Sequence, residues 1–307
     1  MAAVIHGNPS LRLAALLPVV ISILLAGPAM AALENQTGQV TVFWGRHKDE
    51  GSLREACDSG MYTSIIMSFL NVYGNGRYNL DLSGHQFITG VGDDIKHCQS
   101  AGISISLSIR GNHSLPNKQS ALDLFDHIWN AYLGGSQKGV HRPFGDAVLN
   151  GVDLFFEQGT PVKNYDVLAR ELAKHSNGGV TKKPIRLTAT LPCGFISHHT
   201  NGGVVITTGI YERIHVRFFD DDDHTDHYNS YSEDAWDSWT AAYPSSRIFL
   251  GLPASQEAAK EGYLYPKSLY YGVLPVVQKA ANYGGVMLWD RYYDESSKYS
   301  GYVKRWA

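Results

Sequence analysis

The chain contains eight short apolar runs rich in Val, Ile and Phe, and this repetition constrains its fold more than any other feature. Nearly continuous apolar runs of this length are typical of strands in a parallel sheet that is buried on both faces. The stretches between them have helical spacing, so strands and helices alternate, which predicts a (β/α)8 TIM barrel. The runs are residues 39–44, 64–69, 103–109, 151–156, 185–190, 214–219, 248–252 and 285–289.

Two of the intervening stretches show the helical pattern most clearly. In residues 120–132 and 165–175, apolar side chains recur three or four positions apart, as on one face of a helix. A doubly wound open sheet is the alternative with the same alternation, but no phosphate-binding glycine motif opens the chain. No low-complexity linker divides residues 32–307, so we expect a single barrel domain there.

Residues 1–31 have the pattern of a secretory signal peptide. Arg12 is followed by an apolar run, residues 13–26, and then by Ala29-Met30-Ala31, an A-x-A cleavage site. The run is short for a membrane-spanning helix, and Pro18 interrupts it. No later segment is long and apolar enough to cross a membrane, so we expect a secreted, extracellular protein without membrane contact.

The charge of the chain argues against nucleic acid as a partner. The sequence has 26 Lys and Arg against 29 Asp and Glu, and removal of Arg12 with the signal peptide leaves a net charge of −4. A surface that neutralises phosphates needs an excess of basic residues. We therefore expect no nucleic-acid partner.

Three cysteines and two glycosylation acceptors fit a secreted chain. Two of Cys57, Cys98 and Cys193 are expected to form a disulfide, although counting alone leaves the pairing open. The triplets that begin at Asn35 and Asn112 match the N-glycosylation pattern. Such triplets also occur by chance and stay unused.

The strongest chemical signal is the string Asn-Gly-Val-Asp-Leu-Phe-Phe-Glu, which runs from Asn150 to Glu157. Side chains alternate along a strand, so Asp153, Phe155 and Glu157 point to the same side, which is the barrel interior. Glu157 ends the strand, and in (β/α)8 barrels the polar residues at the carboxyl ends of the strands form the active site.

This string resembles the D-G-x-D-x-D-x-E signature of glycoside hydrolase family 18, as found in plant class III chitinases. The likeness extends over nearly all of residues 32–307 and includes Leu288-Trp289-Asp290 on the last strand. Within the family the chain is most similar to the cereal xylanase inhibitor protein type, with which it shares residues 51–62 and the Trp-Thr-Ala-Ala-Tyr-Pro string at 239–244. The resemblance implies the same barrel.

Four departures from an active chitinase imply that the chain is not an enzyme. In the family the glutamate, here Glu157, protonates the leaving oxygen while the substrate's own acetamido oxygen attacks the anomeric carbon. Phe155 replaces the aspartate that holds the acetamido group, and Phe219 replaces a tyrosine that orients it. Arg110 stands where the family has a glycine, and Asn150 replaces the first aspartate. Loss of one such electrostatic group typically slows catalysis by about 100-fold or more.

Three residues of the family's catalytic site remain as remnants, namely Asp153, Glu157 and Trp289. We expect Glu157 to pair with a neighbouring cation, Arg110 or Arg217, because a lone acid contributes little to catalysis. Trp289 is either a platform for a sugar ring or a plug that fills the barrel mouth.

The resemblance also implies that Cys57 pairs with Cys98 and that Cys193 stays outside the disulfide. The cysteine that pairs with the third one in relatives would lie in the acidic stretch 220–227, and it is missing here. This stretch has no regular ligand spacing, so we expect a solvated loop that binds no metal. No other cofactor is expected.

The resemblance further points to a loop that contacts family 11 xylanases. In the relatives this loop, before the fifth strand, places an arginine between two catalytic carboxylates of the enzyme. Glycine takes the arginine's place here, so a lysine is the candidate cation and weaker inhibition is expected. An ordinary solvated loop is the alternative. The candidate residues are Gly178, Gly179, Val180, Thr181, Lys182 and Lys183.

A second contact surface is implied on the helix before the seventh strand, at about residues 233–243, which binds family 10 xylanases in the relatives. Its buried stripe is expected to contain Ala235, Trp236, Trp239 and Ala242. The relatives have a lysine at the position of Ser238, so the cation of this contact is missing. The residues expected outside, and hence the candidates, are Asp234, Asp237, Ser238 and Ala241.

The resemblance therefore implies a monomeric, extracellular inhibitor of microbial, especially fungal, endo-1,4-β-xylanases of families 10 and 11, acting in plant defence in the apoplast. A lectin-like pseudo-chitinase that binds chitin or other oligosaccharides without hydrolysis is the alternative from another class. An active chitinase with an unusual site is the third. Inhibition of xylanases and binding of chitin oligomers distinguish the first two.

Overall fold

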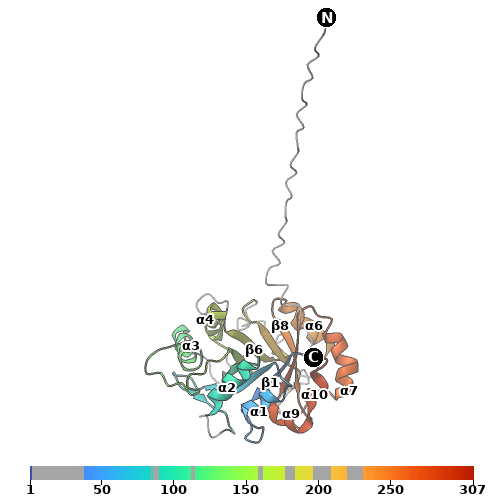
Figure 1. Cartoon of the computed structure of the whole chain (residues 1–307), viewed down its shortest axis with the longest axis horizontal. Coiled ribbons are helices and arrows are strands. Elements are labelled where there is room, and N and C mark those ends of the chain that lie inside the picture. Colours follow the sequence, from blue (N-terminus) through green and yellow to red (C-terminus); the bar gives the residue numbers. More distant parts are fainter. Residues whose placement is uncertain are drawn as a thin grey trace. The chain divides into compact units, whose positions relative to one another are not determined.

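In the computed structural model, the sheet of the chain is a closed barrel of eight parallel strands with helices around it (Figure 1). The structure describes Met1 and residues 38–307, apart from 84, 86–89, 112–114, 158–161, 177–183, 196–208 and 220–230. Its strands are β1 (Val40–Trp44), β2 (Ser64–Val72), β3 (Tyr78–Leu80), β4 (Ser104–Arg110), β5 (Gly151–Phe155), β6 (Arg186–Pro192), β7 (Arg213–Arg217), β8 (Arg247–Pro253) and β9 (Tyr283–Trp289).

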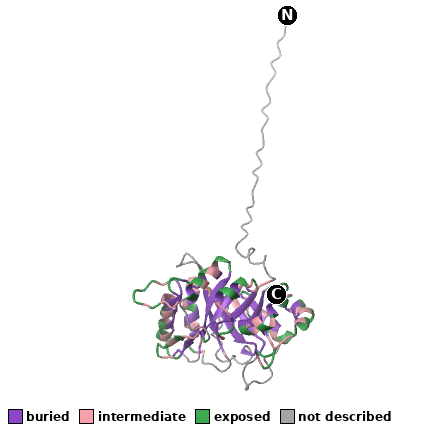
Figure 2. Cartoon of the chain, turned by 60° about the horizontal axis from the view of Figure 1, so that its bottom comes forward, coloured by how far each residue is buried: buried purple, intermediate pink, exposed green. Residues whose placement is uncertain are grey.

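The order of the strands closes the sheet on itself. Neighbouring strands follow the order β1-β9-β8-β7-β6-β5-β4-β2, and β1 also pairs with β2. All of these pairings are parallel, as the apolar runs predict. The buried strands form the centre, and the exposed residues lie on the surrounding helices and loops (Figure 2). The prediction of a (β/α)8 barrel is therefore confirmed.

One short strand, β3, is absent from the sequence prediction. It pairs antiparallel with the end of β2, where Val72 lies opposite Tyr78. The chain reverses between them through Gly74, Asn75 and Gly76, which all have positive φ. The strand has only three residues and is partly exposed, so it has no apolar run that could reveal it. This pairing also explains why β2 continues three residues beyond the predicted end.

Helices cover the outside of the barrel on the connections between strands. Several begin at a side chain that caps the first turn, such as Ser52 before α1 and Asn117 before α3. The helical segments are α1 (Leu53–Asp58), α2 (Val91–Ser100), α3 (Lys118–Tyr132), α4 (Tyr165–Ser176), α6 (Glu233–Ala242), α7 (Pro266–Ser268), the π-helical turn η2 (Leu269–Val273), α8 (Leu274–Val277), α9 (Arg291–Ser297) and α10 (Tyr299–Val303).

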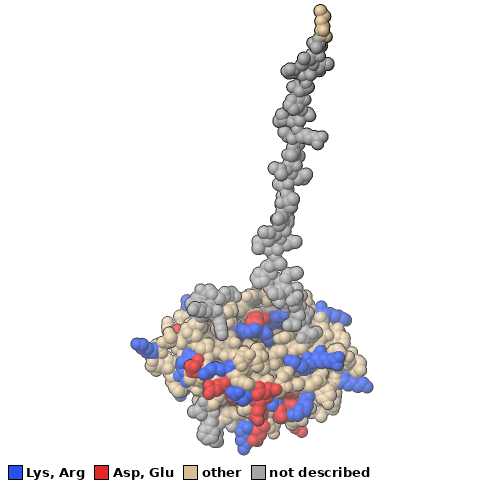
Figure 3. Space-filling model, in the orientation of Figure 1, with Lys and Arg blue, Asp and Glu red and all other residues tan. Residues whose placement is uncertain are grey.

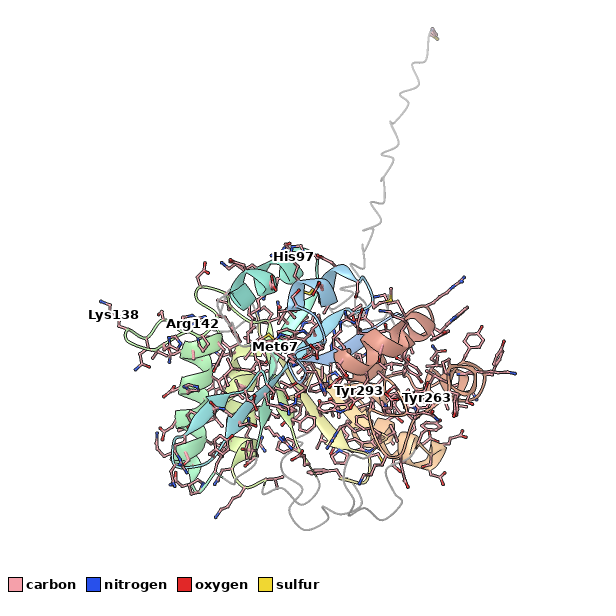
Figure 4. The ribbon with its side chains drawn as sticks, turned by 90° about the horizontal axis from the view of Figure 1, so that it is seen from below. Met67, His97, Lys138, Arg142, Tyr263 and Tyr293 are labelled. Atoms are coloured by element: carbon pink, nitrogen blue, oxygen red, sulfur yellow. A yellow bond between two sulfur atoms is a disulfide. The ribbon has the colours of Figure 1, made fainter. Side chains whose placement is uncertain are left out.

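The connection between α3 and β5 is organised by Arg142. Its guanidinium donates to the backbone oxygens of Asn130, Leu133 and Ala147 at 2.6, 3.0 and 3.1 Å, respectively, and to that of Gly145 at 3.0 Å. Figure 4 shows Arg142 at the base of this loop and Lys138 at its outer end. The bonds fix the approach of the chain to the strand that carries the family signature.

A disulfide joins Cys57 on α1 to Cys98 on α2, with their Cα atoms 5.6 Å apart. This is the pairing that the resemblance implies. The bridge closes a loop with a sequence separation of 41 residues, which in the chain-entropy model stabilises the fold by about 4 kcal/mol. Cys193 is buried and takes no part in a disulfide.

The surface carries mixed charges. Acidic and basic side chains are interspersed over the face seen in Figure 3, in keeping with the small net charge of the chain. Among the residues that the structure describes, no helix combines the length and hydropathy needed to cross a membrane.

Candidate functional site

A layer of polar side chains lies inside the barrel around Asp153. The Asp153 carboxylate is fully buried and accepts hydrogen bonds from Ser108 on β4 and from Thr188 and Thr190 on β6, at 2.9, 2.7 and 2.9 Å. The Nδ1 atom of His215 on β7 lies 3.6 Å from the same carboxylate. Three hydroxyl donors compensate for the loss of water around this charge. Asp153 is thus a satisfied structural centre that ties three strands together.

An aromatic layer fills the barrel two residues further along the strands, at the next positions whose side chains point inward. Phe43 on β1 meets Phe155 on β5 with ring centroids 5.7 Å apart, and Phe69 on β2 lies 4.9 Å from Phe155. β1 and β5 are not neighbours in the sheet, so these rings meet in the interior. Side-chain alternation therefore directs Phe155 inward, as predicted. The buried members of this layer are Phe43, Ile66, Phe69, Phe155, Phe219, Phe249 and Met287.

Trp289 covers this aromatic layer at the end of β9. Its ring centroid lies 5.2 Å from that of Phe43, 5.9 Å from Phe155 and 6.4 Å from Phe219. The indole is partly buried by these contacts. This packing favours the plug over the sugar platform.

Three arginines lie over the rings of Phe69 and Phe155 in this layer. The guanidinium carbon of Arg217 is 4.5 Å from the centroid of Phe155, and those of Arg46 and Arg110 are 5.3 and 5.4 Å from the centroid of Phe69. Arg217 is buried and donates to the backbone oxygen of Phe156 at 2.9 Å. The rings stabilise these cations through their negative faces. Positive charge therefore occupies the place where Phe155 replaces an aspartate.

Glu157 follows β5 and is held by one of these arginines. Its Oε1 atom lies 2.5 Å from Nη2 of Arg110, and about a third of each side chain is exposed. The carboxylate thus has one of the two cationic partners that the sequence suggests. The ion pair holds the carboxylate against a side chain of the protein, at the position where the family's acid would face a leaving oxygen.

Asn150, at the position of the signature's first aspartate, has a structural role. Its Oδ1 atom accepts hydrogen bonds from the backbone of Ile105 at 2.8 Å and from Gln99 at 2.9 Å. These bonds link the start of β5 to β4 and α2. An amide serves this purpose as well as a carboxylate.

The buried His215 predicts how stability depends on pH. Burial lowers the pKa of its imidazole, and the nearby Asp153 offsets part of this effect. In the unfolded chain the pKa returns to about 6.5, so on acidification the unfolded chain takes up a proton that the folded protein does not. The contribution of His215 to the free energy of unfolding is therefore fully present above about pH 6.5. Below this pH it falls, by up to about 1.4 kcal/mol per pH unit.

We expect His215→Gln to remove this dependence. Urea unfolding at pH 7.5 and 5.5 should show a loss for the wild type that is about 1 kcal/mol larger than for the variant. His141→Gln, at an exposed position, is the control and should behave as the wild type. Equal losses in all three proteins would contradict the assignment to His215.

The loop for the family 11 contact has described residues only at its base. Residues 177–183, with all six candidates from Gly178 to Lys183, lie outside the described part of the chain. At the base, the backbone N–H of Ile185 donates to the carbonyl oxygen of His175 at 3.2 Å. The His175 ring lies 4.4 Å from Trp129 and 5.3 Å from Phe125, both on α3. The two ends of the loop are therefore joined and packed against a neighbouring helix.

The helix for the family 10 contact is α6. Asp234, Asp237, Ser238 and Ala241 are exposed, as expected, and Trp236 and Trp239 are buried. Ala235 is half-buried. The prediction that Ala242 belongs to the buried stripe is wrong, because the helix ends at this residue and its side chain is exposed. The sequence of α6 contains no basic residue, so its outer face is acidic.

Other sequence predictions fall outside the described residues. Both glycosylation acceptors, Asn35 and Asn112, belong to this group, as does the acidic stretch 220–227. Within the described residues, no group of three or more His, Cys, Asp and Glu side chains is arranged to hold a metal ion.

The sequence reasoning did not identify the position of Arg217 over Phe155 or the network around Asp153. The network has a detectable signal, because Thr188 and Thr190 alternate with Leu187 and Ala189 along an otherwise apolar strand. Such alternation marks polar side chains directed to one side of a sheet. The position of the arginine has no comparable signal, since it depends on contacts between strands.

The barrel, the signature on β5 and the tryptophan at the end of β9 together define a glycoside hydrolase barrel of the chitinase class. The chain belongs to glycosyl hydrolases family 18, whose model matches residues 39–264. It is 56% identical to xylanase inhibitor protein 1 of Triticum aestivum, covering 96% of each chain. It is 48% identical to xylanase inhibitor protein 1 of Oryza sativa subsp. japonica, covering 94% of each.

A solved structure shows the same architecture. The crystal structure of the xylanase and alpha-amylase inhibitor protein XAIP-II from Scadoxus multiflorus matches with a TM-score of 0.76 and 34% sequence identity. The match covers 86% of this chain and 97% of that one. The similarity to inhibitor proteins thus extends over nearly the whole chain.

Proposed function

We propose that the chain is a secreted, catalytically inactive chitinase homologue that inhibits microbial endo-1,4-β-xylanases, especially fungal ones, in plant defence. The observation that carries this proposal is the 56% identity to a xylanase inhibitor protein over 96% of the chain. Function in such proteins belongs to surface loops and helices, which a barrel can present without a working cleft.

The contacts at the barrel mouth support catalytic inactivity. Glycosidases pass through a transition state that carries positive charge on the sugar ring. Arg110 and Arg217 bring two cations to the mouth, and Phe155 removes the carboxylate that stabilises this charge in active relatives. Repulsion then replaces attraction at the reacting carbon.

The charge of α6 favours family 11 xylanases as partners over family 10 enzymes. The active site of a retaining glycosidase contains two carboxylates. Glu233, Asp234 and Asp237 make the exposed face of α6 acidic, so contact with such a site is repulsive. The loop at 177–183 contains two lysines and no acidic residue. We therefore propose this loop as the principal inhibitory surface.

An inhibition assay with purified fungal xylanases of families 10 and 11 tests the proposal. We expect inhibition of at least one family 11 enzyme. Inhibition of family 10 enzymes should be weaker than this by about tenfold or more, because an unfavourable charge contact of about 1.4 kcal/mol changes affinity tenfold. Ser238→Lys supplies a cation on α6 and should strengthen only the inhibition of family 10. A protein that inhibits neither family but binds chitin oligomers would contradict the proposal and favour a lectin.

The remaining parts of the proposal concern processing and assembly. Residues 1–31 act as a signal peptide, residues 32–307 form the single mature domain in the apoplast, and this domain works as a monomer. The disulfide between Cys57 and Cys98 supports an oxidising compartment.

A further inference from the structure

A pocket with three aromatic rings in its lining lies on the outer wall of the barrel, between the connection from β8 to β9 and the end of the chain. Its volume is about 330 Å3, and we call it the crossover pocket. It is lined by residues of η2 and α8, by Gln278, and by Trp306, which follows α10. The helices α7 and α10, which precede these two parts of the chain, are adjacent at the orange and red end of the ribbon (Figure 1). Its lining residues are Tyr270, Tyr271, Leu274, Pro275, Gln278 and Trp306.

Two of the three rings that line the pocket are exposed. Tyr271 is 71% and Trp306 40% exposed. Single exposed rings are common on protein surfaces, but several that line one hollow indicate a binding site. Tyr265 and Tyr302 lie on neighbouring segments and are also exposed. The pocket therefore lies in a part of the chain that carries several exposed aromatic rings.

The rings are held in fixed positions by the surrounding structure. Tyr270 lies edge-on to Tyr271 and to Trp306, with centroids 4.6 and 5.0 Å apart. Gln278 donates from Nε2 to the backbone oxygen of Trp306, and the guanidinium of Arg305 lies 5.0 Å from the Trp306 centroid. Fixed rings lose little conformational entropy when a ligand binds.

The two tyrosines belong to the π-helical turn η2, between α7 and α8. A π turn is less favourable than an α turn, and such turns occur frequently at functional sites. Leu269 and Val273 of the turn are buried in the core, which leaves Tyr270 and Tyr271 on the outer side. The irregular turn thus carries two of the rings that line the pocket.

We propose that the crossover pocket binds a neutral, β-1,4-linked pyranose oligosaccharide. Such chains present flat faces of C–H groups, which pack on aromatic rings, and equatorial hydroxyls, which bond to polar groups at the rim. The tyrosine hydroxyls and the Gln278 amide are suited to this second role. A volume near the lower limit of ligand sites fits one or two sugar rings rather than a helix or a protein loop.

The charge of the lining supports a neutral ligand. None of the six lining residues carries a formal charge, and Arg305, which contacts the Trp306 ring, is not one of them. A phosphorylated ligand or an acidic peptide would require basic side chains in the pocket itself. The proposal is independent of xylanase inhibition, which we assign to another surface.

Calorimetric titration of the secreted protein with xylohexaose, cellohexaose and chitohexaose tests the proposal. These three probes share the β-1,4 linkage and distinguish xylan, cellulose and chitin as the source. We expect binding of at least one probe, and Tyr271→Ala and Trp306→Ala should each weaken it by about tenfold or more, through loss of a stacked ring. Tyr271→Phe keeps the ring and should remain within a few-fold of wild type.

Tyr292→Ala is the matched control, because Tyr292 is an exposed tyrosine after β9, beside His47 near the barrel mouth. It should bind the probes as the wild type does. The proposal is overturned if no probe binds at millimolar concentration, or if Tyr271→Ala and Trp306→Ala both bind normally. Loss of binding in Tyr292→Ala alone would assign the sugar to the barrel mouth instead. Tyr271→Ala should retain full xylanase inhibition in every case.

Discussion

Replacing one of the two loop lysines, Lys182 or Lys183, with alanine is expected to weaken inhibition of a family 11 xylanase by about 30- to several-thousand-fold. In the proposed complex, the lysine that enters the enzyme's cleft would lie between two carboxylates in a poorly solvated site. Loss of one partner from such a pair costs about 2–5 kcal/mol of binding, or a tenfold change for each 1.4 kcal/mol. The other lysine should act as a rim charge, with a small effect that salt suppresses.

Two further variants test the same model. Gly178→Arg restores the side chain of the relatives and should strengthen inhibition, because arginine can bond both oxygens of a carboxylate. Glu157→Ala changes the barrel mouth and should leave inhibition unchanged. Inhibition constants measured for all four variants decide the outcome. The loop model is wrong if both lysine variants inhibit normally while Glu157→Ala does not inhibit.

Chitinase activity is expected to be absent, and the double change Phe155→Asp with Phe219→Tyr is not expected to restore it. The carboxylate introduced at position 155 would lie beside the Arg217 guanidinium, which is 4.5 Å from the present ring. It would therefore pair with that cation rather than with a substrate. Glu157 would also remain bound to Arg110. Each lost group accounts for about 100-fold in rate or more, so the double variant should stay far below an active enzyme.

Turnover of a fluorogenic chitotriose measures this prediction, with Glu157→Gln as the background control. Adding Arg110→Gly to the double variant should release Glu157 and raise turnover above that background. Wild-type turnover well above the Glu157→Gln control would show that the site is active. A double variant as fast as a class III chitinase would show that the arginines do not obstruct the site.

The barrel could be predicted from the sequence because its eight strands are buried on both faces and therefore almost continuously apolar. β3 escaped prediction because it is short and partly exposed. Ala242 was misplaced because periodicity extends a helix pattern to its last residue, whereas α6 ends at Ala242 and leaves this side chain exposed. Local patterns thus fix the elements but not their ends.

The candidate site was predictable where the type of residue alone decides the chemistry. Phe155 cannot act as a carboxylate in any conformation, so its consequence needs no structure. The placement of Arg217 over Phe155 depends on packing between β5 and β7, which are separated by β6. The network of Asp153 likewise combines residues from four strands, β4, β5, β6 and β7. Contacts of this kind are set by tertiary structure, which no periodicity reveals.

The closed base of the loop between α4 and β6 has a consequence for the kinetics of inhibition. The bond from Ile185 to His175, with the imidazole packed on α3, holds the two ends of the loop together before any enzyme arrives. The two described ends of the loop therefore need not come together at encounter, which removes one slow step from association. Changes within the loop should therefore alter mainly how long each complex survives, whereas distant surface charges should alter how often complexes form.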